Sequence, residues 1–159
     1  MLTIRSAVPQ DVPLILSLVH ELAEYEREPN SVSATEADIR RDGFGTHPKF
    51  RVVIAESDGE PAGMAFFFSH YSTWKGREGI FVEDLIVRPR FRGQGVGKAL
   101  MAHLARTTIK EGSYGMRWEV LDWNEPAVKF YKGIGGQFRE HGRTMQLTGE
   151  DLKRLAENC

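Results

Sequence analysis

The chain has 159 residues, enough for a sizeable core, so we expect a single domain spanning residues 1–159. Its hydrophobic fraction of 41% and charged fraction of 27% are typical of a soluble globular protein. A net charge of −1 with no dominant basic face argues against nucleic acid as a partner, and the lack of an 18-residue apolar run argues against a membrane. The only cysteine, Cys159, excludes an intrachain disulfide, and the N-terminus does not resemble a secretory signal, so we expect a cytoplasmic protein.

The first half of the chain is predicted to alternate short strands and helices. Apolar side chains recur every three or four residues between Val12 and Leu22, which predicts a helix that ends near Tyr25. Thr35 and Asp38 have the spacing of a helix N-cap. The expected elements are a strand at Leu2–Ser6, a first helix that begins between Pro9 and Pro13, a short helix at Thr35–Asp42, and two hairpin strands, Arg51–Glu56 and Ala62–Tyr71, joined by the Asp58-Gly59 turn.

The second half continues this pattern, and its longest element is a helix at Val96–Glu111 that Gly112 ends. The other expected elements are strands at Ile80–Val87 and Arg117–Leu121, a helix at Pro126–Lys132 with Asn124 near its cap, two short strands around Gln137–Glu140 and Thr144–Leu147, and a final helix capped by Thr148. Strands and helices that alternate along one chain predict the α/β class.

Three glycines, Gly93, Gly95 and Gly97, stand between an apolar strand and the start of an amphipathic helix. The N–H groups at a helix N-terminus are unpaired and carry the positive end of the helix dipole, and glycine lets a phosphate approach them. Arg92 and Lys98 add full positive charges. The segment therefore predicts a pyrophosphate site, while the same residues also suit a tight turn that closes a helix against a sheet. The spacings of the dinucleotide-binding fingerprint and of the P-loop are both absent.

The sequence Arg92-Gly-Gln-Gly-Val-Gly97 resembles the Arg/Gln-x-x-Gly-x-Gly/Ala signature of the GNAT-type N-acetyltransferases. Six further blocks are similar, in order and spacing, to the branch with the diamine (spermidine/spermine) acetyltransferases and the thialysine Nε-acetyltransferases. These blocks are Glu21–Glu26, Asp42–Gly45, His70–Arg77, Val82–Val87, Val120–Asn124 and Phe130–Lys132. The resemblance implies a single-domain GNAT fold, α/β with a mixed, mostly antiparallel central sheet of about six or seven strands and helices on both faces. It also implies a homodimer.

The resemblance further implies acetyl-coenzyme A (acetyl-CoA) as co-substrate. In the family a central strand pairs with the pantetheine arm and the glycine loop wraps the pyrophosphate. The residues this assigns to the cofactor are Leu85, Ile86 and Val87 on the strand, Arg92, Gly93, Gln94, Gly95, Val96, Gly97 and Lys98 in the loop, and Asn124, Pro126, Ala127, Tyr131 and Lys132 beyond it. Asn124 also suits a helix cap, and the two roles are compatible. We expect no metal, because the histidines show no His-x-x-x-His pair and the chain has no Cys-x-x-Cys.

Tyr131 and Glu83 are the expected catalytic residues. Tyr131 stands where the family carries the tyrosine that protonates the departing coenzyme A thiolate, a role that suits a phenol with a solution pKa of about 10. The resemblance places Glu83 at the substrate amine, whose proton it can accept directly or through water. A structurally bonded tyrosine hydroxyl and an ion pair of Glu83 with a nearby cation are the alternatives. Asp84 adjoins Glu83 on a strand, so we expect it to face the other way and to be structural.

The residues that the resemblance assigns to the acceptor are Tyr25, Glu26, Trp74 and Glu83. A carboxylate and a phenol suit an ammonium or amino-acid head group. Taken alone, Glu26 is also typical of a solvated surface charge, and Trp74 of a core or interface aromatic. The block around Ser72 resembles the thialysine side of the branch, because the polyamine side carries an acidic residue at that position.

These residues predict an enzyme that moves an acetyl group from acetyl-CoA to a primary amine of a small lysine-like molecule. Direct attack in a ternary complex is expected, because Cys159 is unsuited to forming an acyl-enzyme. The alternatives are a polyamine acetyltransferase, a protein-lysine acetyltransferase and a catalytically silent acyl-CoA sensor on the same fold. Tyr131, Glu83 and the complete glycine loop argue against the silent sensor.

Overall fold

The computed structural model describes residues 1–157, so Cys159 and any role for it lie outside the described part. The chain divides into two compact units, Met1–Leu121 and a smaller unit that begins at Asp122. The first unit contains every strand found among residues 1–157, together with the first three α-helices. The single domain expected from the chain length stays a prediction.

The central sheet of the first unit is mixed. Its strands are β1 (Leu2–Ser6), β2 (Arg51–Ser57), β3 (Glu60–Ser72), β4 (Arg77–Val87) and β5 (Met116–Trp118). They lie side by side in chain order; the first four are antiparallel to their neighbours, and β5 runs parallel to β4. The hairpin of β2 and β3 turns at Asp58 and Gly59, as the sequence predicts, and both Asp58 and Gly59 have positive φ.

The expected six or seven strands are not found in the described residues, where the sheet has five. The two segments predicted as strands around Gln137–Glu140 and Thr144–Leu147 are irregular. An alternating pattern shows that a segment could be a strand, but a strand forms only against a hydrogen-bonded partner, and an isolated hairpin is marginal in water. The residues within these two segments do not show whether a second strand lies beside them.

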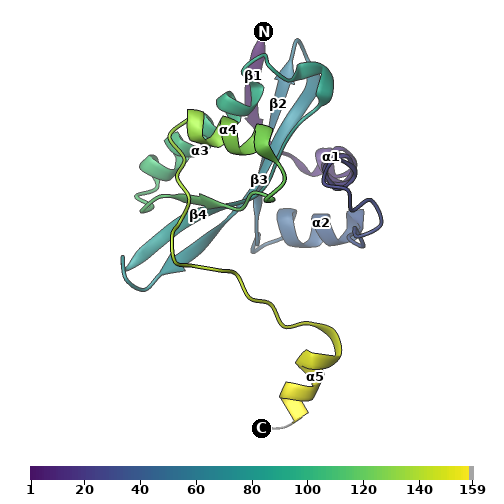
Figure 1. Ribbon diagram of the computed structural model, residues 1–159. Coiled ribbons are helices and arrows are strands. Elements are labelled where there is room, and N and C mark those ends of the chain that lie inside the picture. The colour runs from purple at the N-terminus through teal and green to yellow at the C-terminus, as the bar shows by residue number, and fades with distance from the viewer. Residues whose placement is uncertain (158–159) are drawn as a thin grey trace. The chain divides into compact units, whose positions relative to one another are not determined.

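Three helices cover the sheet of the first unit: α1 (Val12–Tyr25), α2 (Glu36–Phe44) and α3 (Val96–Lys110). Helices α1 and α2 lie on one face and α3 lies on the other (Figure 1). Alternate strand residues separate the two cores, since Val52 and Ile54 pack toward α1 while Val53 and Ala55 pack toward α3. The expected α/β layering with helices on both faces is therefore confirmed for this unit.

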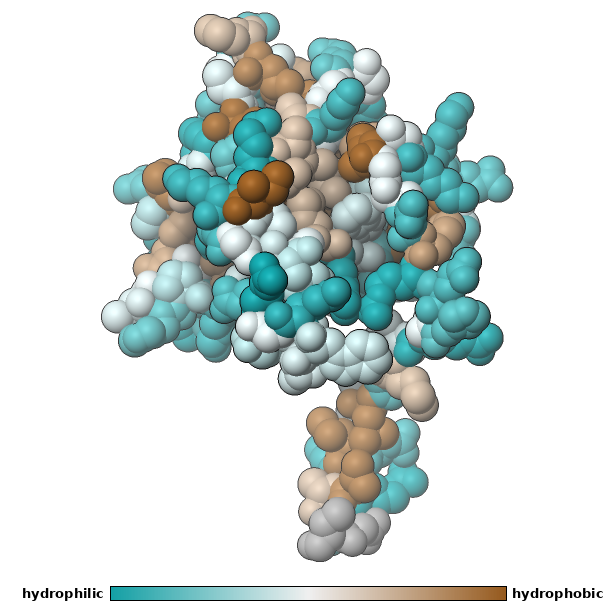
Figure 2. Space-filling view, turned by 90° about the vertical axis from the view of Figure 1, so that its left-hand side faces the viewer, coloured by the Kyte–Doolittle hydropathy of each residue, from teal (hydrophilic) through white to brown (hydrophobic). Residues whose placement is uncertain are grey.

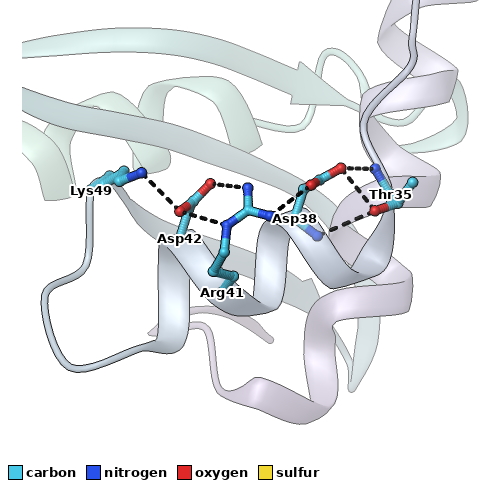
Figure 3. A network of polar contacts seen from close by, with 5 residues as sticks. All are labelled: Thr35, Asp38, Arg41, Asp42 and Lys49. Atoms are coloured by element: carbon cyan, nitrogen blue, oxygen red, sulfur yellow. Dashed lines mark hydrogen bonds and ion pairs between the residues drawn. The ribbon is translucent and has the colours of Figure 1, made fainter.

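Local signals fix the start of α2 as the sequence predicts. The Thr35 hydroxyl accepts a hydrogen bond from the Asp38 backbone N–H, and the Asp38 carboxylate accepts from the Thr35 N–H and hydroxyl, a reciprocal cap. Figure 3 shows that the Arg41 guanidinium lies between Asp38 and Asp42, and that Lys49 reaches Asp42 from the following loop. These two cations lower the pKa of Asp42 to about 2.

The second unit contains α4 (Glu125–Gly133) and α5 (Gly149–Glu157). Asn124 caps α4 by accepting a hydrogen bond from the Ala127 N–H at 3.3 Å, as predicted. Helix α5 begins after Thr148, also as predicted, and leaves Leu152 and Leu155 about half exposed. Figure 2 shows hydrophobic surface, in brown, at the C-terminal end of the chain. Among residues 1–157, no helix is both long enough and apolar enough to cross a membrane.

Candidate active site

The turn between β4 and α3 has the geometry of an anion site. Gly93 and Gly95 have φ of 74° and 82°, and a Cβ at either position would point into open space. Gly95 is the N-cap of α3 and offers no side-chain cap to its first N–H groups. Gln94 closes the turn by donating from Nε2 to the Arg90 carbonyl at 2.8 Å. Unfilled space beside uncapped N–H groups fits a pyrophosphate.

The helix that follows this turn is firmly anchored. Val96, Leu100 and Leu104 lie on one face of α3 and are almost completely buried against the sheet. Phe91, just before the turn, belongs to the same core. The glycine turn is therefore held at both ends, so that its N–H groups keep their direction without a bound ligand.

The end of β4 has an open edge. Strand β5 pairs with β4 only at Ile80, Phe81 and Val82, whereas β3 continues alongside β4 as far as Val87. Strand β5 therefore does not pair with Leu85–Val87, although the Val87 carbonyl accepts a side-chain hydrogen bond from Arg92 Nε at 3.0 Å. An exposed strand edge of this kind can pair with the amides of an extended ligand. This is the position that the sequence analysis assigns to the pantetheine arm.

Strand β4 contains an irregularity at Glu83 that the sequence pattern does not reveal. Asp84 lies opposite Phe66 and Val82 lies opposite Phe67, so Glu83 has no residue opposite it on β3. The side chains of Val82 and Leu85 both join the core beneath α3, which strict alternation would forbid for residues three apart. The expected strict alternation, with Glu83 and Asp84 on opposite faces, therefore does not hold at this point of β4.

Asp84 is a half-buried carboxyl group in an acidic environment. Burial, and then the charges of Glu83 and Glu26, raise its pKa from an ordinary 3.8 to about 6. Burial also raises the pKa of Glu26. The structure thus brings together two predicted acceptor residues, Glu83 and Glu26, around a third carboxyl group, Asp84, for which the sequence predicts a structural role. In the sequence, Asp84 is an acidic residue within an otherwise apolar strand. Burying such a residue costs free energy unless it has a functional role or is paired with another charge.

The end of α1 is connected to the glycine turn by two arginines. Arg88 donates from Nε and Nη2 to the Glu21 carboxylate, at 2.8 Å for the shortest bond. The Arg92 guanidinium lies 4.9 Å from the centroid of the Tyr25 ring, and its Nε donates to the Val87 carbonyl at 3.0 Å. Arg92 was expected only as a charge for the pyrophosphate. The periodicity of apolar residues along the chain describes local structure only. It cannot indicate a contact between segments that lie more than 60 residues apart in the sequence.

In the second unit, α4 carries the predicted Tyr131. Tyr131 is seven residues beyond Asn124 and four beyond Ala127, so the helical repeat places all three positions on one side of α4. Tyr131 is half-buried beside Phe130, with ring centroids 5.2 Å apart. Pro126 lies in the first turn, and the Lys132 ammonium lies 5.2 Å from the ring centroid of Phe138.

Trp74 and Ser72 lie at the far end of the β3–β4 hairpin. Trp74 is 97% exposed in the turn, and Ser72 accepts a hydrogen bond from the Lys75 N–H. Glu83 lies six positions beyond Arg77, the first residue of β4 after the turn, a span of about 20 Å. The structure therefore does not bring Trp74 or Ser72 to Glu83 within the same chain, and the acceptor role of Trp74 stays a prediction.

The fold and these residues define the class of protein. The model of the acetyltransferase (GNAT) family matches residues 15–135, so the chain belongs to the GNAT family of acetyltransferases. It is 38% identical to a thialysine N-epsilon-acetyltransferase of Bos taurus over 96% of each chain. It is 32% identical to the spermidine/spermine N(1)-acetyltransferase-like protein 1 of Homo sapiens, over 83% of this chain and 20% of that protein.

Among solved structures, an integron cassette protein from the mobile metagenome of V. cholerae matches with a TM-score of 0.81. That match has 25% identity and covers 98% of each chain. GNAT acetyltransferases use acetyl-CoA as co-substrate, and the open β4 edge and glycine turn fit this molecule. Within residues 1–157, no group of three or more His, Cys, Asp and Glu side chains could hold a metal ion.

Proposed function

We propose that this chain transfers the acetyl group of acetyl-CoA to the primary amine of a small lysine-like molecule of the thialysine type. The observation that carries the transfer is the open edge of β4 at Leu85–Val87 leading into the uncapped start of α3. The observation that favours the acceptor is the thialysine N-epsilon-acetyltransferase that matches 96% of the chain. The proposed preference for a thialysine-type acceptor does not rest on Ser72, because Ser72 lies far from Glu83 along the hairpin.

The proposed chemistry is direct attack in a ternary complex. The amine nitrogen forms a bond to the thioester carbonyl carbon, and the carbon–sulfur bond breaks. Glu83 accepts the amine proton directly or through a water molecule, and Tyr131 donates its phenolic proton to the departing thiolate. Leu85–Val87 orient the pantetheine arm, and the loop Arg92–Lys98 holds the pyrophosphate. Asn124, Pro126, Ala127 and Lys132 complete the proposed cofactor contacts.

The acidic environment of β4 supports a cationic acceptor. Glu26 and Glu83 both act on Asp84 through their charges, so an ammonium that binds here would relieve repulsion among three carboxyl groups. A bound cation would also lower the pKa of Asp84 back toward its ordinary value. Tyr25, next to Glu26 and 37% exposed, is the proposed contact for the far end of the acceptor.

An acceptor screen tests this proposal. The chain is incubated with acetyl-CoA and thialysine, lysine, spermidine or a lysine-containing peptide, and the release of free thiol is followed. The expected result is that kcat/KM is highest for thialysine or lysine. A clear preference for spermidine would support the polyamine alternative suggested by the human relative, and a preference for the peptide would support protein-lysine acetylation. If the chain binds acetyl-CoA but acetylates none of these amines, the result would support the alternative of a catalytically silent acyl-CoA sensor.

We also propose a homodimer. Its support is the exposed apolar surface of the second unit, where Met145 is 92% exposed and Leu152 and Leu155 remain half exposed. Apolar patches of this kind often mark protein interfaces. Light scattering after size exclusion should give twice the chain mass, and Leu152→Glu should shift it to one chain mass. A wild-type chain that stays monomeric would contradict the proposal. The cytoplasmic location stays a prediction of the sequence.

A further inference from the structure

Two side chains of α1 meet two arginines of the β4–α3 turn at matching spacing. Glu21 and Tyr25 are four residues apart, so they lie one helical turn apart on the same side of α1. Arg88 and Arg92 are also four residues apart, and Arg88 pairs with Glu21 while Arg92 lies over Tyr25. The turn proposed to hold pyrophosphate is thus attached to the helix end that carries the proposed acceptor residues.

The two contacts differ in strength. The Glu21–Arg88 pair is partly buried, with several hydrogen bonds, and Arg88 also donates to the Pro61 carbonyl at 3.2 Å, so this pair fixes α1 to the sheet. Arg92 and Tyr25 are more exposed, and their contact is of cation–π type. The Val87 carbonyl accepts from Arg92 Nε and sets the direction of the guanidinium. Because this contact is weak but has a defined geometry, a ligand bound next to Arg92 or next to Tyr25 can strengthen it.

We infer that Arg92 is a positioning residue that couples the two substrates: Tyr25 holds its guanidinium in place for the pyrophosphate, and Arg92 in turn holds Tyr25 in place for the acceptor. The inference rests on the proposed function. The coupling is reciprocal, because a ligand that orders one partner reduces the ordering that the second ligand must provide. Acetyl-CoA and the amine are therefore expected to bind with positive cooperativity.

The first test measures acetyl-CoA binding by calorimetry with no amine present. Tyr25→Leu should weaken binding about two- to five-fold, which corresponds to the roughly 0.5–1 kcal/mol of an exposed cation–π contact. The same substitution in an Arg92→Gln background should cause no further loss. Tyr25→Phe keeps the ring, so its affinity should equal that of the wild type. A purely structural effect of Tyr25 would weaken binding equally with and without Arg92, and would overturn the inference.

Arg90→Gln is the matched control. Arg90 belongs to the same turn and carries the same charge, but its guanidinium stacks on Phe91 at 4.6 Å and pairs with Glu60. Tyr25→Leu should therefore have its full effect in the Arg90→Gln background. Thermal unfolding shows whether each variant is folded. If Tyr25→Leu is not folded, the effect of Arg92→Gln on the amine KM still tests the inference.

A second measurement addresses the acceptor. Arg92→Gln should raise the KM for the amine about two- to five-fold at saturating acetyl-CoA, and this increase should vanish in the Tyr25→Leu background. An amine KM that is unchanged in Arg92→Gln would overturn the inference. The two failures are distinguishable: a wild-type chain that binds no acetyl-CoA refutes the proposed function, whereas one that binds and acetylates with additive mutational effects refutes only the coupling.

Discussion

The turn between β4 and α3 and the segment that follows α4 are both irregular, but they differ in what surrounds them. The turn at Arg92–Gly95 has Phe91 buried just before it and Val96 just after it. The segment from Gln137 to Thr148 has no regular structure, and its apolar side chains, such as Phe138 and Met145, remain mostly exposed. The turn is therefore held by the core on both sides, whereas the apolar side chains of the segment are left mostly in solvent in the part of the chain that the structure describes.

This difference shows which sequence signals predict local structure correctly by themselves. Glycines, caps and helix periodicity act on neighbours in the chain, so the turn, α3 and the cap of α2 form where the sequence predicts them. Strand signals depend on a second segment, and the predicted strands at residues 137–140 and 144–147 do not form in the described part of the second unit. Four predictions test this contrast.

The largest effect is expected in the second unit, at Tyr131. Tyr131→Phe keeps the ring and removes the proton, so kcat should fall about 10²- to 10⁴-fold, the range for a general acid. Acetyl-CoA affinity should change little. Steady-state kinetics at saturating substrates, with calorimetry of cofactor binding, provide the measurement. A kcat within a factor of three of the wild type would mean that Tyr131 serves only packing.

The contrast in packing is tested directly by two leucines. Leu104 is fully buried under α3, so Leu104→Ala should lower the free energy of unfolding by about 2–5 kcal/mol. Leu155 is 55% exposed on α5, so Leu155→Ala should cost less than about 0.5 kcal/mol in dilute solution. Urea unfolding of both variants measures this. Equal losses would refute the contrast, and a loss for Leu155→Ala that grows with protein concentration would support the homodimer.

Asp84 should make stability depend on pH. Its pKa of about 6 in the folded chain exceeds the ordinary 3.8, so the folded state binds the proton more tightly. Stability should therefore fall as the pH rises from about 4 to 6, by up to about 3 kcal/mol. Asp84→Asn removes this loss and should become more stable than the wild type above pH 6.

The measurement for Asp84 is urea unfolding of both chains between pH 4 and 8. Asp42→Asn is the control, because the pKa of Asp42 is lowered to about 2 and its contribution is lost only as the pH falls below about 4. Its stability difference from the wild type should be constant over this range. A constant difference for Asp84→Asn as well would show that Asp84 does not titrate near pH 6.

The smallest expected effect concerns the glycine turn. Gly95→Asp places a carboxylate at the uncapped start of α3, so acetyl-CoA should bind about ten- to a hundred-fold more weakly, or about 1–3 kcal/mol. Gly59→Asp is the control, because Gly59 has nearly the same φ of 84° and also faces open space, but lies in the β2–β3 hairpin. Calorimetry should show normal affinity for Gly59→Asp. Normal affinity for a folded Gly95→Asp would remove the turn from the cofactor site.

Much of the candidate site could be predicted from the sequence, because its parts are local. The glycine turn, the start of α3 and the Asn124 cap each depend on residues within one turn of chain. The irregularity at Glu83 could not be predicted, because it depends on how β4 is paired with β3. The distance of Trp74 from Glu83 could not be predicted either, because it is set by the length of that hairpin.

The sequence by itself determined the family, the helices and the turn that is open to an anion, because each depends on side chains close together in the chain or on motifs kept in order. Only the tertiary structure decided the number of strands, the acidic environment of Asp84 and the contact of Arg92 with Tyr25. These depend on which distant segments become neighbours, and burial and charge act through space, where separation along the chain has no influence.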